Sequence, residues 1–298
     1  MITFQGNYSP IITPIDSQDR VDLASLRQVV RYQLDAGMDG FYVCGGTGEG
    51  LLLTVSERKA VLETVLDEVK GRVGIIAHVG AFQTADTLEL ARHAGDAGVD
   101  AVAAIPPAYF YKPDTLGLVR YYTQVAGASA APFFVYNIPQ RVGINMTPAL
   151  FDQLMSVPNI IGMKDSSGDL YAMGLLFTGG RTPLIFEGSE TVLLPALLYG
   201  ACGGIGTSHN ILPRHFAQMW RLYQAGDIAG AASVQRRINE FLGEIIPITG
   251  PILNGTKEIM EWMGLPCGTL RSPNRPLTEE ERTELKRRLE KAGFFDEP

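Results

Sequence analysis

The chain has 298 residues, of which 46% are hydrophobic and 19% charged, and its formal net charge is −7 at pH 7. Such a composition excludes a disordered chain, and an acidic balance without any basic run excludes a nucleic-acid-binding surface. No apolar run approaches the ~18 residues that a membrane helix needs. Residues 1–5 lack the charged and apolar regions of a signal peptide, so we expect neither membrane nor nucleic-acid partners.

The cysteines and histidines indicate the compartment. Cys44, Cys202 and Cys267 are far apart and odd in number, which argues against a disulfide framework. The histidines form no metal-ligand spacing. We therefore expect a cytoplasmic protein with buried thiols and no metal.

Eight short apolar runs follow one another along the chain. Near-continuous apolar runs are typical of parallel strands that are covered on both faces. The eighth run contains three glycines and has little side chain to pack. The predicted strands lie near residues 7–13, 41–45, 73–79, 100–105, 133–137, 159–164, 184–188 and 203–207.

Stretches with helical periodicity separate these runs. The first has an apolar face that includes Leu26 and Val30, and the second begins at a capping box formed by Thr54 and Glu57. Further helices are predicted at 84–97, 115–128, 148–156, 168–178, 191–199 and 211–224. Eight strands, each followed by a helix, predict a closed (β/α)₈ TIM barrel, because an open doubly wound sheet has fewer strands.

The alternation stops near residue 225. Segments 227–245, 252–263 and 278–293 read as three further helices, too few to bury a second core. The predicted organisation is therefore a barrel carrying the active site over 1–225 and a helical extension over 226–298. We expect the extension to pack on the barrel or on a partner subunit.

The sixth predicted strand ends in Lys164, one of seven lysines in the chain. Active sites of such barrels lie at the carboxyl ends of the strands. A dry site disfavours the ammonium form of a lysine, and an uncharged amine attacks a ketone to form a Schiff base. The alternative is a structural lysine that pairs with Asp165 or Glu187.

Two neighbouring motifs suit the same chemistry. The fifth strand ends in Tyr136, whose hydroxyl lies within reach of Lys164 if strands five and six are adjacent. The second strand runs into Gly45-Gly46-Thr47-Gly48-Glu49-Gly50, where glycine amides and the Thr47 hydroxyl can surround an anion. A carboxylate clamp, an amine and an acid/base group are together what a small 2-oxo acid requires.

These residues resemble the pyruvate-dependent class I aldolase family of dihydrodipicolinate synthase and N-acetylneuraminate lyase. The resemblance covers nearly the whole chain. Its landmarks are residues 9–14, Gly45-Gly46-Thr47-Gly48-Glu49, Tyr136-Asn137-Ile138-Pro139, Gly162-Met163-Lys164-Asp165 and Gly203-Gly204-Ile205-Gly206-Thr207.

The resemblance implies a role for each site residue. Lys164 forms the Schiff base with pyruvate, Tyr136 is the acid/base group, and Tyr109 is the tyrosine lent to a neighbouring subunit. A homotetramer built as a dimer of dimers is implied, with no cofactor, because the lysine itself is the electron sink. The implied substrate-binding residues are Gly46, Thr47, Arg141, Ser166, Gly188, Glu190, Ile205 and Thr207.

The subfamily follows from finer features. Residues 77–80, 166–171 and 208–211 resemble N-acetylneuraminate lyase, but Thr191 replaces the second acid of the pair that binds the sugar hydroxyls there. Arg141 resembles the arginine with which the synthase holds its second substrate, although Val142 stands where a hydroxyl residue is usual. Gly46 replaces a Ser or Thr that is usual in both subfamilies.

We therefore expect a lyase similar to N-acetylneuraminate lyase that acts on a 2-oxo-3-deoxy acid, with pyruvate and an aldehyde as reactants. The closest alternative is 4-hydroxy-tetrahydrodipicolinate synthase, which joins pyruvate and aspartate semialdehyde. A 2-oxo acid dehydratase or deaminase, a phosphate-binding isomerase and a non-catalytic barrel that binds a 2-oxo acid are the further alternatives.

Overall fold

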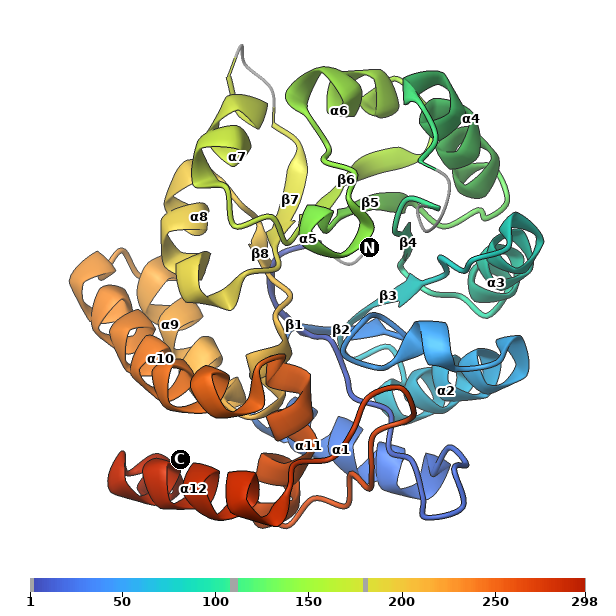
Figure 1. Ribbon diagram of the computed structural model, residues 1–298. Helices are drawn as coiled ribbons and strands as arrows, with labels where there is room; N and C mark the ends of the chain where they lie inside the picture. The colour runs from blue at the N-terminus through green and yellow to red at the C-terminus, as the bar shows by residue number, and fades with distance from the viewer. Residues whose placement is uncertain (1–2, 108–111, 179–181, 298) are drawn as a thin grey trace.

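The structure is a computed structural model that describes residues 3–107, 112–178 and 182–297. Eight parallel strands form one closed barrel in sequential order, which confirms the predicted TIM barrel (Figure 1). The strands are β1 (Gly6–Ser9), β2 (Gly40–Val43), β3 (Gly74–His78), β4 (Ala101–Ala104), β5 (Phe133–Asn137), β6 (Ile160–Asp165), β7 (Leu184–Glu187) and β8 (Gly203–Gly204).

A helix follows each strand and covers the outside of the barrel. The capping box predicted at Thr54 and Glu57 is present and begins the second helix. A short helix, α5 (Pro139–Val142), which the sequence did not predict, lies in the loop after β5. The covering helices are α1 (Leu23–Asp35), α2 (Val55–Val69), α3 (Thr84–Asp96), α4 (Thr115–Ala126), α6 (Pro148–Met155), α7 (Leu170–Leu176), α8 (Leu193–Tyr199) and α9 (Pro213–Gln224).

Large side chains fill the barrel interior, and the last strand closes it. Tyr8, Phe134 and Phe186 are fully buried and pack together inside the barrel. The last strand, β8, has only two residues and joins β7 to β1. A Cβ atom on Gly203 would lie 1.9 Å from the carbonyl oxygen of Gly6, so only glycine allows the two backbones this approach.

Three helices follow the barrel and pack against it: α10 (Ile228–Thr249), α11 (Ile252–Trp262) and α12 (Glu279–Lys291). The first of them packs beside α9 and α12, and α11 packs against the 3₁₀ turn at Thr207–Asn210 (Figure 1). The α10 helix continues beyond the predicted end at residue 245, because buried Ile245 and Thr249 extend its apolar face through Pro247.

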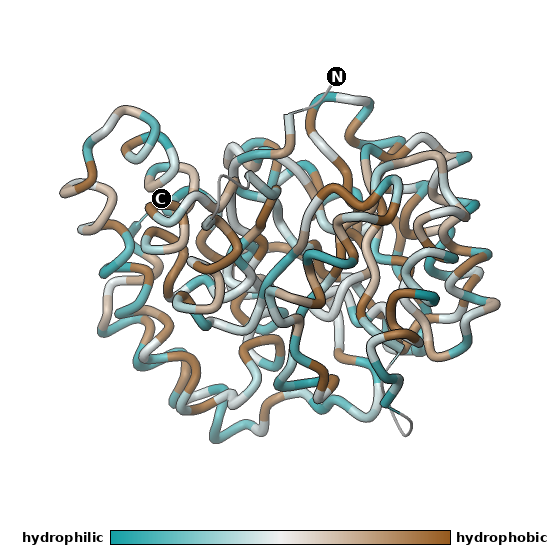
Figure 2. Tube along the Cα trace, turned by 90° about the horizontal axis from the view of Figure 1, so that it is seen from above, coloured by the Kyte–Doolittle hydropathy of each residue, from teal (hydrophilic) through white to brown (hydrophobic). Residues whose placement is uncertain are grey.

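Many of the outermost turns are hydrophilic (Figure 2). No helix within the described ranges is both long enough and apolar enough to cross a bilayer.

Candidate active site

Lys164 and Tyr136 lie side by side at the carboxyl ends of adjacent strands, because the register of β5 and β6 pairs the two residues directly. Both side chains point into the barrel, where Lys164 is 5% and Tyr136 6% exposed. The Nζ atom of Lys164 lies 3.9 Å from the centroid of the Tyr136 ring and 5.5 Å from that of Tyr42. The amine therefore sits between two aromatic rings, out of bulk water.

The amine is held by a hydroxyl group. Lys164 Nζ donates a hydrogen bond of 3.0 Å to Ser166 Oγ, and no ion pair of Lys164 is found within the described part of the chain. The geometry therefore does not support the alternative, a structural lysine that pairs with Asp165 or Glu187. Gly188 makes room for the hydroxyl, because a Cβ atom there would lie 1.9 Å from Ser166 Oγ.

Two buried acids lie on neighbouring strands beside the lysine. Asp165 of β6 is paired in register with Glu187 of β7. Asp165 Oδ1 accepts hydrogen bonds of 2.9 Å from both Asn137 Nδ2 and the Ser167 N–H. Glu187 Oε1 accepts one from the Ser189 N–H at 2.5 Å, but its Oε2 is buried without a partner.

Burial changes the acidity of this pair. Loss of hydration raises the pKa of Glu187 to about 8, and the negative charge of Asp165 adds to the rise. Burial also raises the pKa of Asp165, although the hydrogen bonds from Ser167 and Asn137 oppose it. Glu187 is therefore protonated at neutral pH.

The glycine-rich loop after β2 meets the end of β8. Thr47 Oγ1 lies 2.8 Å from Thr207 Oγ1, so two hydroxyl groups from opposite ends of the barrel sequence are placed together. No atom lies within 4 Å of the position that a Cβ on Gly46 would take. The loop therefore leaves open space where a larger side chain would project.

A cavity of about 470 Å³ opens above these residues. Gly46, Thr47, Tyr136, Arg141 and Thr207, all predicted from the sequence, line it together. Lys164 itself is not among the described lining residues. Its amine lies 3.9 Å from the centroid of the Tyr136 ring, which forms part of the wall.

Four of the predicted substrate-binding residues also lie outside this wall. Ser166 and Gly188 surround the lysine amine, and Ile205 is buried in the barrel interior. Glu190 is turned to the 3₁₀ turn instead: its Oε1 accepts a hydrogen bond of 2.9 Å from the Ser208 N–H. Tyr109, the remaining predicted residue, lies outside the described residues.

His78, at the end of β3, lines the cavity but carried no motif that singled it out. Its Nδ1 lies 3.1 Å from the Cys44 carbonyl oxygen, and the Ile105 N–H approaches Nε2 at 3.4 Å, which together assign the ring proton to Nδ1. Burial and the Arg58 guanidinium hold the pKa of His78 well below its usual range. The imidazole is therefore neutral.

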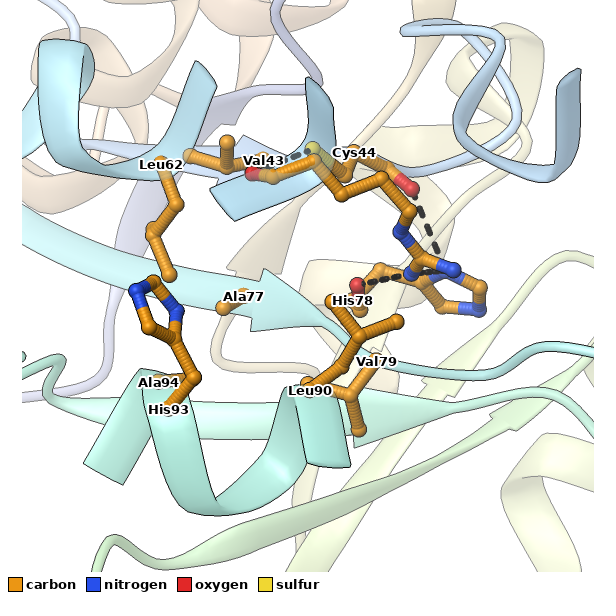
Figure 3. Close-up of a pocket in the computed structure, with 10 residues that line it drawn as sticks. Val43, Cys44, Leu62, Ala77, His78, Val79, Leu90, His93 and Ala94 are labelled. Carbon is orange, nitrogen blue, oxygen red and sulfur yellow. Dashed lines mark hydrogen bonds between the residues drawn. The ribbon is translucent and has the colours of Figure 1, made fainter. Parts of the chain in front are cut away.

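Arg58 of α2 is a second residue that the sequence did not indicate. It is 3% exposed, and its guanidinium donates to the carbonyl oxygens of His78 and Gly80. Figure 3 shows the contact with His78 beside a cavity of about 10 Å³ between β2, β3 and the helices outside them. Arg58 thus fixes the backbone that carries His78.

The C-terminal helices also contribute to the site. Leu253 and Asn254 of α11, with Asn274, line the cavity. Lys257 of the same helix makes a buried ion pair of 2.7 Å with Glu49, the acid of the glycine-rich loop. Lys257 and Glu49 are 208 residues apart in sequence, so no local pattern could have paired them.

The arrangement suits carbonyl chemistry. A buried primary amine next to a phenol can attack a carbonyl carbon and exchange protons with the product. Hydroxyl groups and loop amides can hold an anionic end of the same molecule. Within the described residues no group of three or more His, Cys, Asp or Glu side chains is arranged to hold a metal ion.

Known proteins share this fold over almost their full length. The sequence profile of the dihydrodipicolinate synthetase family matches residues 3–292. A 4-hydroxy-tetrahydrodipicolinate synthase of Thermus thermophilus is 38% identical and covers 98% of this chain and 97% of its own. An N-acetylneuraminate lyase of Citrobacter koseri is 34% identical, with 95% of each chain covered.

Solved structures agree with these sequence matches. YagE of Escherichia coli K12, a protein of the dihydrodipicolinic acid synthase family in complex with pyruvate, superposes with a TM-score of 0.92. It is 29% identical, and the match covers 98% of this chain and 99% of that one.

Proposed function

Since the chain belongs to the dihydrodipicolinate synthetase family, whose members are class I aldolases and lyases, we propose that its Lys164 forms a Schiff base with pyruvate. The protein then makes or breaks the carbon–carbon bond next to the pyruvyl group. The observation that carries this proposal is the Lys164 amine, buried 3.9 Å from the centroid of the Tyr136 ring.

The proposed sequence begins with attack of the Lys164 amine on the keto carbon. Loss of water gives an iminium ion, which withdraws electrons from the neighbouring methyl carbon. Tyr136 removes a proton from that carbon to give an enamine, which adds to an aldehyde. The reverse order cleaves a 4-hydroxy-2-oxo acid, and Thr47 with the loop amides holds the carboxylate in both directions.

The proposed substrate is a 2-oxo-3-deoxy acid, as for an N-acetylneuraminate lyase. The resemblance over residues 166–171 supports this subgroup, and a cavity of about 470 Å³ has room for more than pyruvate. One observation favours 4-hydroxy-tetrahydrodipicolinate synthase as a second candidate. Arg141 lines the cavity without a carboxylate partner within the described ranges, so it is available to a second acid group.

We also propose a cytoplasmic homotetramer. The free thiols of Cys44, Cys202 and Cys267 fit a reducing compartment, and the motif that contains Tyr109 supports a shared subunit interface. Light scattering coupled to size-exclusion chromatography measures the mass directly, and a monomeric mass refutes the tetramer.

The Schiff base is tested by reduction with sodium borohydride in the presence of pyruvate. We expect the peptide that contains Lys164 to gain the mass of pyruvic acid less one oxygen atom. Lys257, the other buried lysine, is the internal control and should remain unmodified because its amine is paired with the Glu49 carboxylate and does not line the cavity. An unmodified Lys164 at saturating pyruvate would refute the proposal.

A further inference from the structure

The amine of Lys164 lies in a corner formed by two aromatic rings. Its Nζ atom is 3.9 Å from the centroid of the Tyr136 ring and 5.5 Å from that of Tyr42, both within the range over which a cation is attracted to a ring face. The two rings have an interplanar angle of 80°, with centroids 5.9 Å apart. They therefore cover the amine from two different directions.

Tyr42, which the sequence did not indicate, presents a ring face and carries no charge. It lies in β2 and is 1% exposed, and its hydroxyl oxygen is buried without a hydrogen-bond partner among the described residues. Loss of hydration raises the pKa of this phenol well above its usual range, so the phenol is neutral. Gly45 makes room for the ring, because a Cβ atom there would lie 2.6 Å from Tyr42 Cε1.

The hydrogen-bond acceptors around the two buried lysines differ in number. Within the described part of the chain, Lys164 Nζ has one acceptor, Ser166 Oγ. Lys257 Nζ has two, Glu49 Oε1 at 2.7 Å and the Thr269 carbonyl oxygen at 2.6 Å. An ammonium group has three N–H donors, whereas a protonated imine has one. One acceptor and two ring faces therefore suit an iminium ion on Lys164 better than an ammonium ion.

We propose that Tyr42 stabilises the iminium ion on Lys164 through the face of its aromatic ring. The inference rests on the proposed function, because the iminium ion arises only when the Lys164 amine reacts with pyruvate. In that step Nζ forms a bond to carbon 2 of pyruvate, and the carbonyl oxygen leaves as water with one proton from the amine and one from the solvent. The product carries a positive charge that the uncharged amine and the keto group lack.

This new charge forms away from bulk water, where an uncompensated charge is costly. The imidazole of His78 is neutral, and the carboxyl groups of Asp165 and Glu187 accept hydrogen bonds from backbone N–H groups rather than from Nζ. A ring face carries a negative electrostatic potential and is already in place before the charge appears. The enamine that follows is uncharged, so the stabilisation is specific to the iminium ion.

The test weakens the Tyr42 ring while keeping its shape. Tyr42→Phe is the first member of a series in which phenylalanines with one, two and three fluorine atoms are then placed at position 42. Each fluorine withdraws electrons from the ring face. Pyruvate alone is the probe: sodium borohydride traps the iminium ion on the full-length protein at graded pyruvate concentrations, and mass spectrometry measures the adduct on the Lys164 peptide.

We expect the pyruvate concentration that gives half-maximal trapping to rise with each fluorine atom. Three fluorine atoms should raise it about three- to thirtyfold relative to Tyr42→Phe, as for loss of a cation–π interaction away from water. Tyr42→Phe should lie within about twofold of the parent, because it keeps the ring. The steps with one and two fluorine atoms give the slope if the third lowers the melting temperature.

The same fluorinated phenylalanines at position 134 are the matched control. Phe134 is 1% exposed in the same barrel interior, where its ring packs against that of Phe186 with centroids 5.8 Å apart. No cation lies over the Phe134 ring among the described residues, so half-maximal trapping should stay within about twofold of the parent. An equal rise at position 134 overturns the inference, because fluorine in the core would then suffice.

The remaining outcomes separate the inference from the proposed function. An adduct on Lys164 whose half-maximal pyruvate concentration does not change along the Tyr42 series refutes the role of the ring and leaves the proposed function intact. A rise in Tyr42→Phe as large as that with three fluorine atoms assigns the effect to the hydroxyl group and also overturns the inference. Absence of the adduct in the parent refutes the proposed function and the inference with it.

Discussion

Two lysines of this protein are buried, and their partners distinguish them. Lys257 is 2% exposed and lies 2.7 Å from the Glu49 carboxylate, which stabilises its ammonium form. Lys164 is 5% exposed and has a hydroxyl group as its hydrogen-bond acceptor. Burial alone therefore does not distinguish the two lysines, and the absence of a neutralising carboxylate is what supports Lys164 as the proposed nucleophile.

The hydroxyl group at Ser166 leads to a first prediction. Ser166→Ala removes the acceptor 3.0 Å from the lysine amine, and we expect kcat to fall about two- to tenfold, as for loss of one hydrogen bond between uncharged groups. Gly188→Ala should act in the same direction by displacing the Ser166 hydroxyl. The kcat of both variants is measured by steady-state kinetics in the cleavage direction, in which pyruvate is a product.

Ser167→Ala is the control for this pair. The Ser167 hydroxyl accepts a hydrogen bond from the Asp169 N–H and does not contact the lysine. Its kcat should stay close to that of the parent. If Ser166→Ala behaves like Ser167→Ala, the hydroxyl beside the amine has no part in the reaction.

A second prediction concerns pH. The pKa of Glu187 rises from 4.5 to about 8 on folding because the carboxyl group is buried, so its contribution to stability is complete below pH 4.5 and is lost as pH rises through 8. Glu187→Gln keeps the acceptor for the Ser189 N–H and removes the titration. Between pH 5 and pH 9 the free energy of unfolding of the parent should fall by on the order of a few kcal/mol more than that of the variant.

Melting temperatures of both proteins over this pH range measure the difference. Parallel curves for the parent and Glu187→Gln would show that Glu187 does not change its protonation on folding.

The sequence indicated the residues that we propose to react and missed the residues that hold their surroundings. Lys164 and Tyr136 stand out because a polar group that ends an apolar strand is visible locally. His78 also ends a strand, but its neutral state depends on Arg58, which reaches it from another element. The position of Glu190 depends on Ser208 in the same way, so spacing alone could not have shown that it turns away from the cavity.

At the level of elements, the closing strand is the least tolerant part of the barrel. Gly203→Ala would place a Cβ atom 1.9 Å from the Gly6 carbonyl oxygen across the β8–β1 pair. We expect the free energy of unfolding to fall by about 2 kcal/mol or more, since the two backbones must separate. Urea unfolding measures the change.

Gly243→Ala provides the contrast within α10. No atom lies within 4 Å of a Cβ there, so the substitution should be neutral or stabilise the helix by up to about 1 kcal/mol. If Gly203→Ala is tolerated equally well, the close approach of the β8 and β1 backbones does not limit closure of the barrel.

The order of strands and helices could be predicted because continuous apolar runs and helical periodicity are properties of single segments. The ends of these elements, and the elements that break the pattern, could not be predicted in this way. The helix α5 begins at Pro139 in a loop too short to show periodicity, and β8 pairs through backbone atoms of two glycines. Both depend on neighbouring elements that a local pattern does not contain.

On the scale of the whole molecule, the C-terminal helices hold the glycine-rich loop. The Glu49 carboxylate accepts hydrogen bonds from Lys257 Nζ, the Arg271 N–H and Asn274 Nδ2. Three donors that lie more than 200 residues from the acid thus fix one end of the loop that carries Thr47. The extension is therefore part of the active-site scaffold.

Lys257→Met tests this link. Removing one partner of a buried ion pair leaves the other charge unpaired, so we expect a loss of about 3–5 kcal/mol in urea unfolding and a higher KM for pyruvate. Lys59→Met is the matched control, because Lys59 and Glu89 also lie 2.7 Å apart but are 30% and 52% exposed. It should change stability by about 1 kcal/mol at most.

If Lys257→Met lowers the free energy of unfolding no more than Lys59→Met does, the C-terminal extension does not act as a scaffold for the glycine-rich loop.

The cavity is lined by residues as far apart as Gly46 and Asn274. During synthesis on the ribosome, its wall is therefore incomplete until nearly all of the chain has emerged. A chain that ends before Asn274 lacks part of this wall, whereas a ligand that binds the finished cavity stabilises the folded molecule by mass action. A bound ligand thus stabilises, at the same time, the loop that carries Gly46 and the segment that carries Asn274.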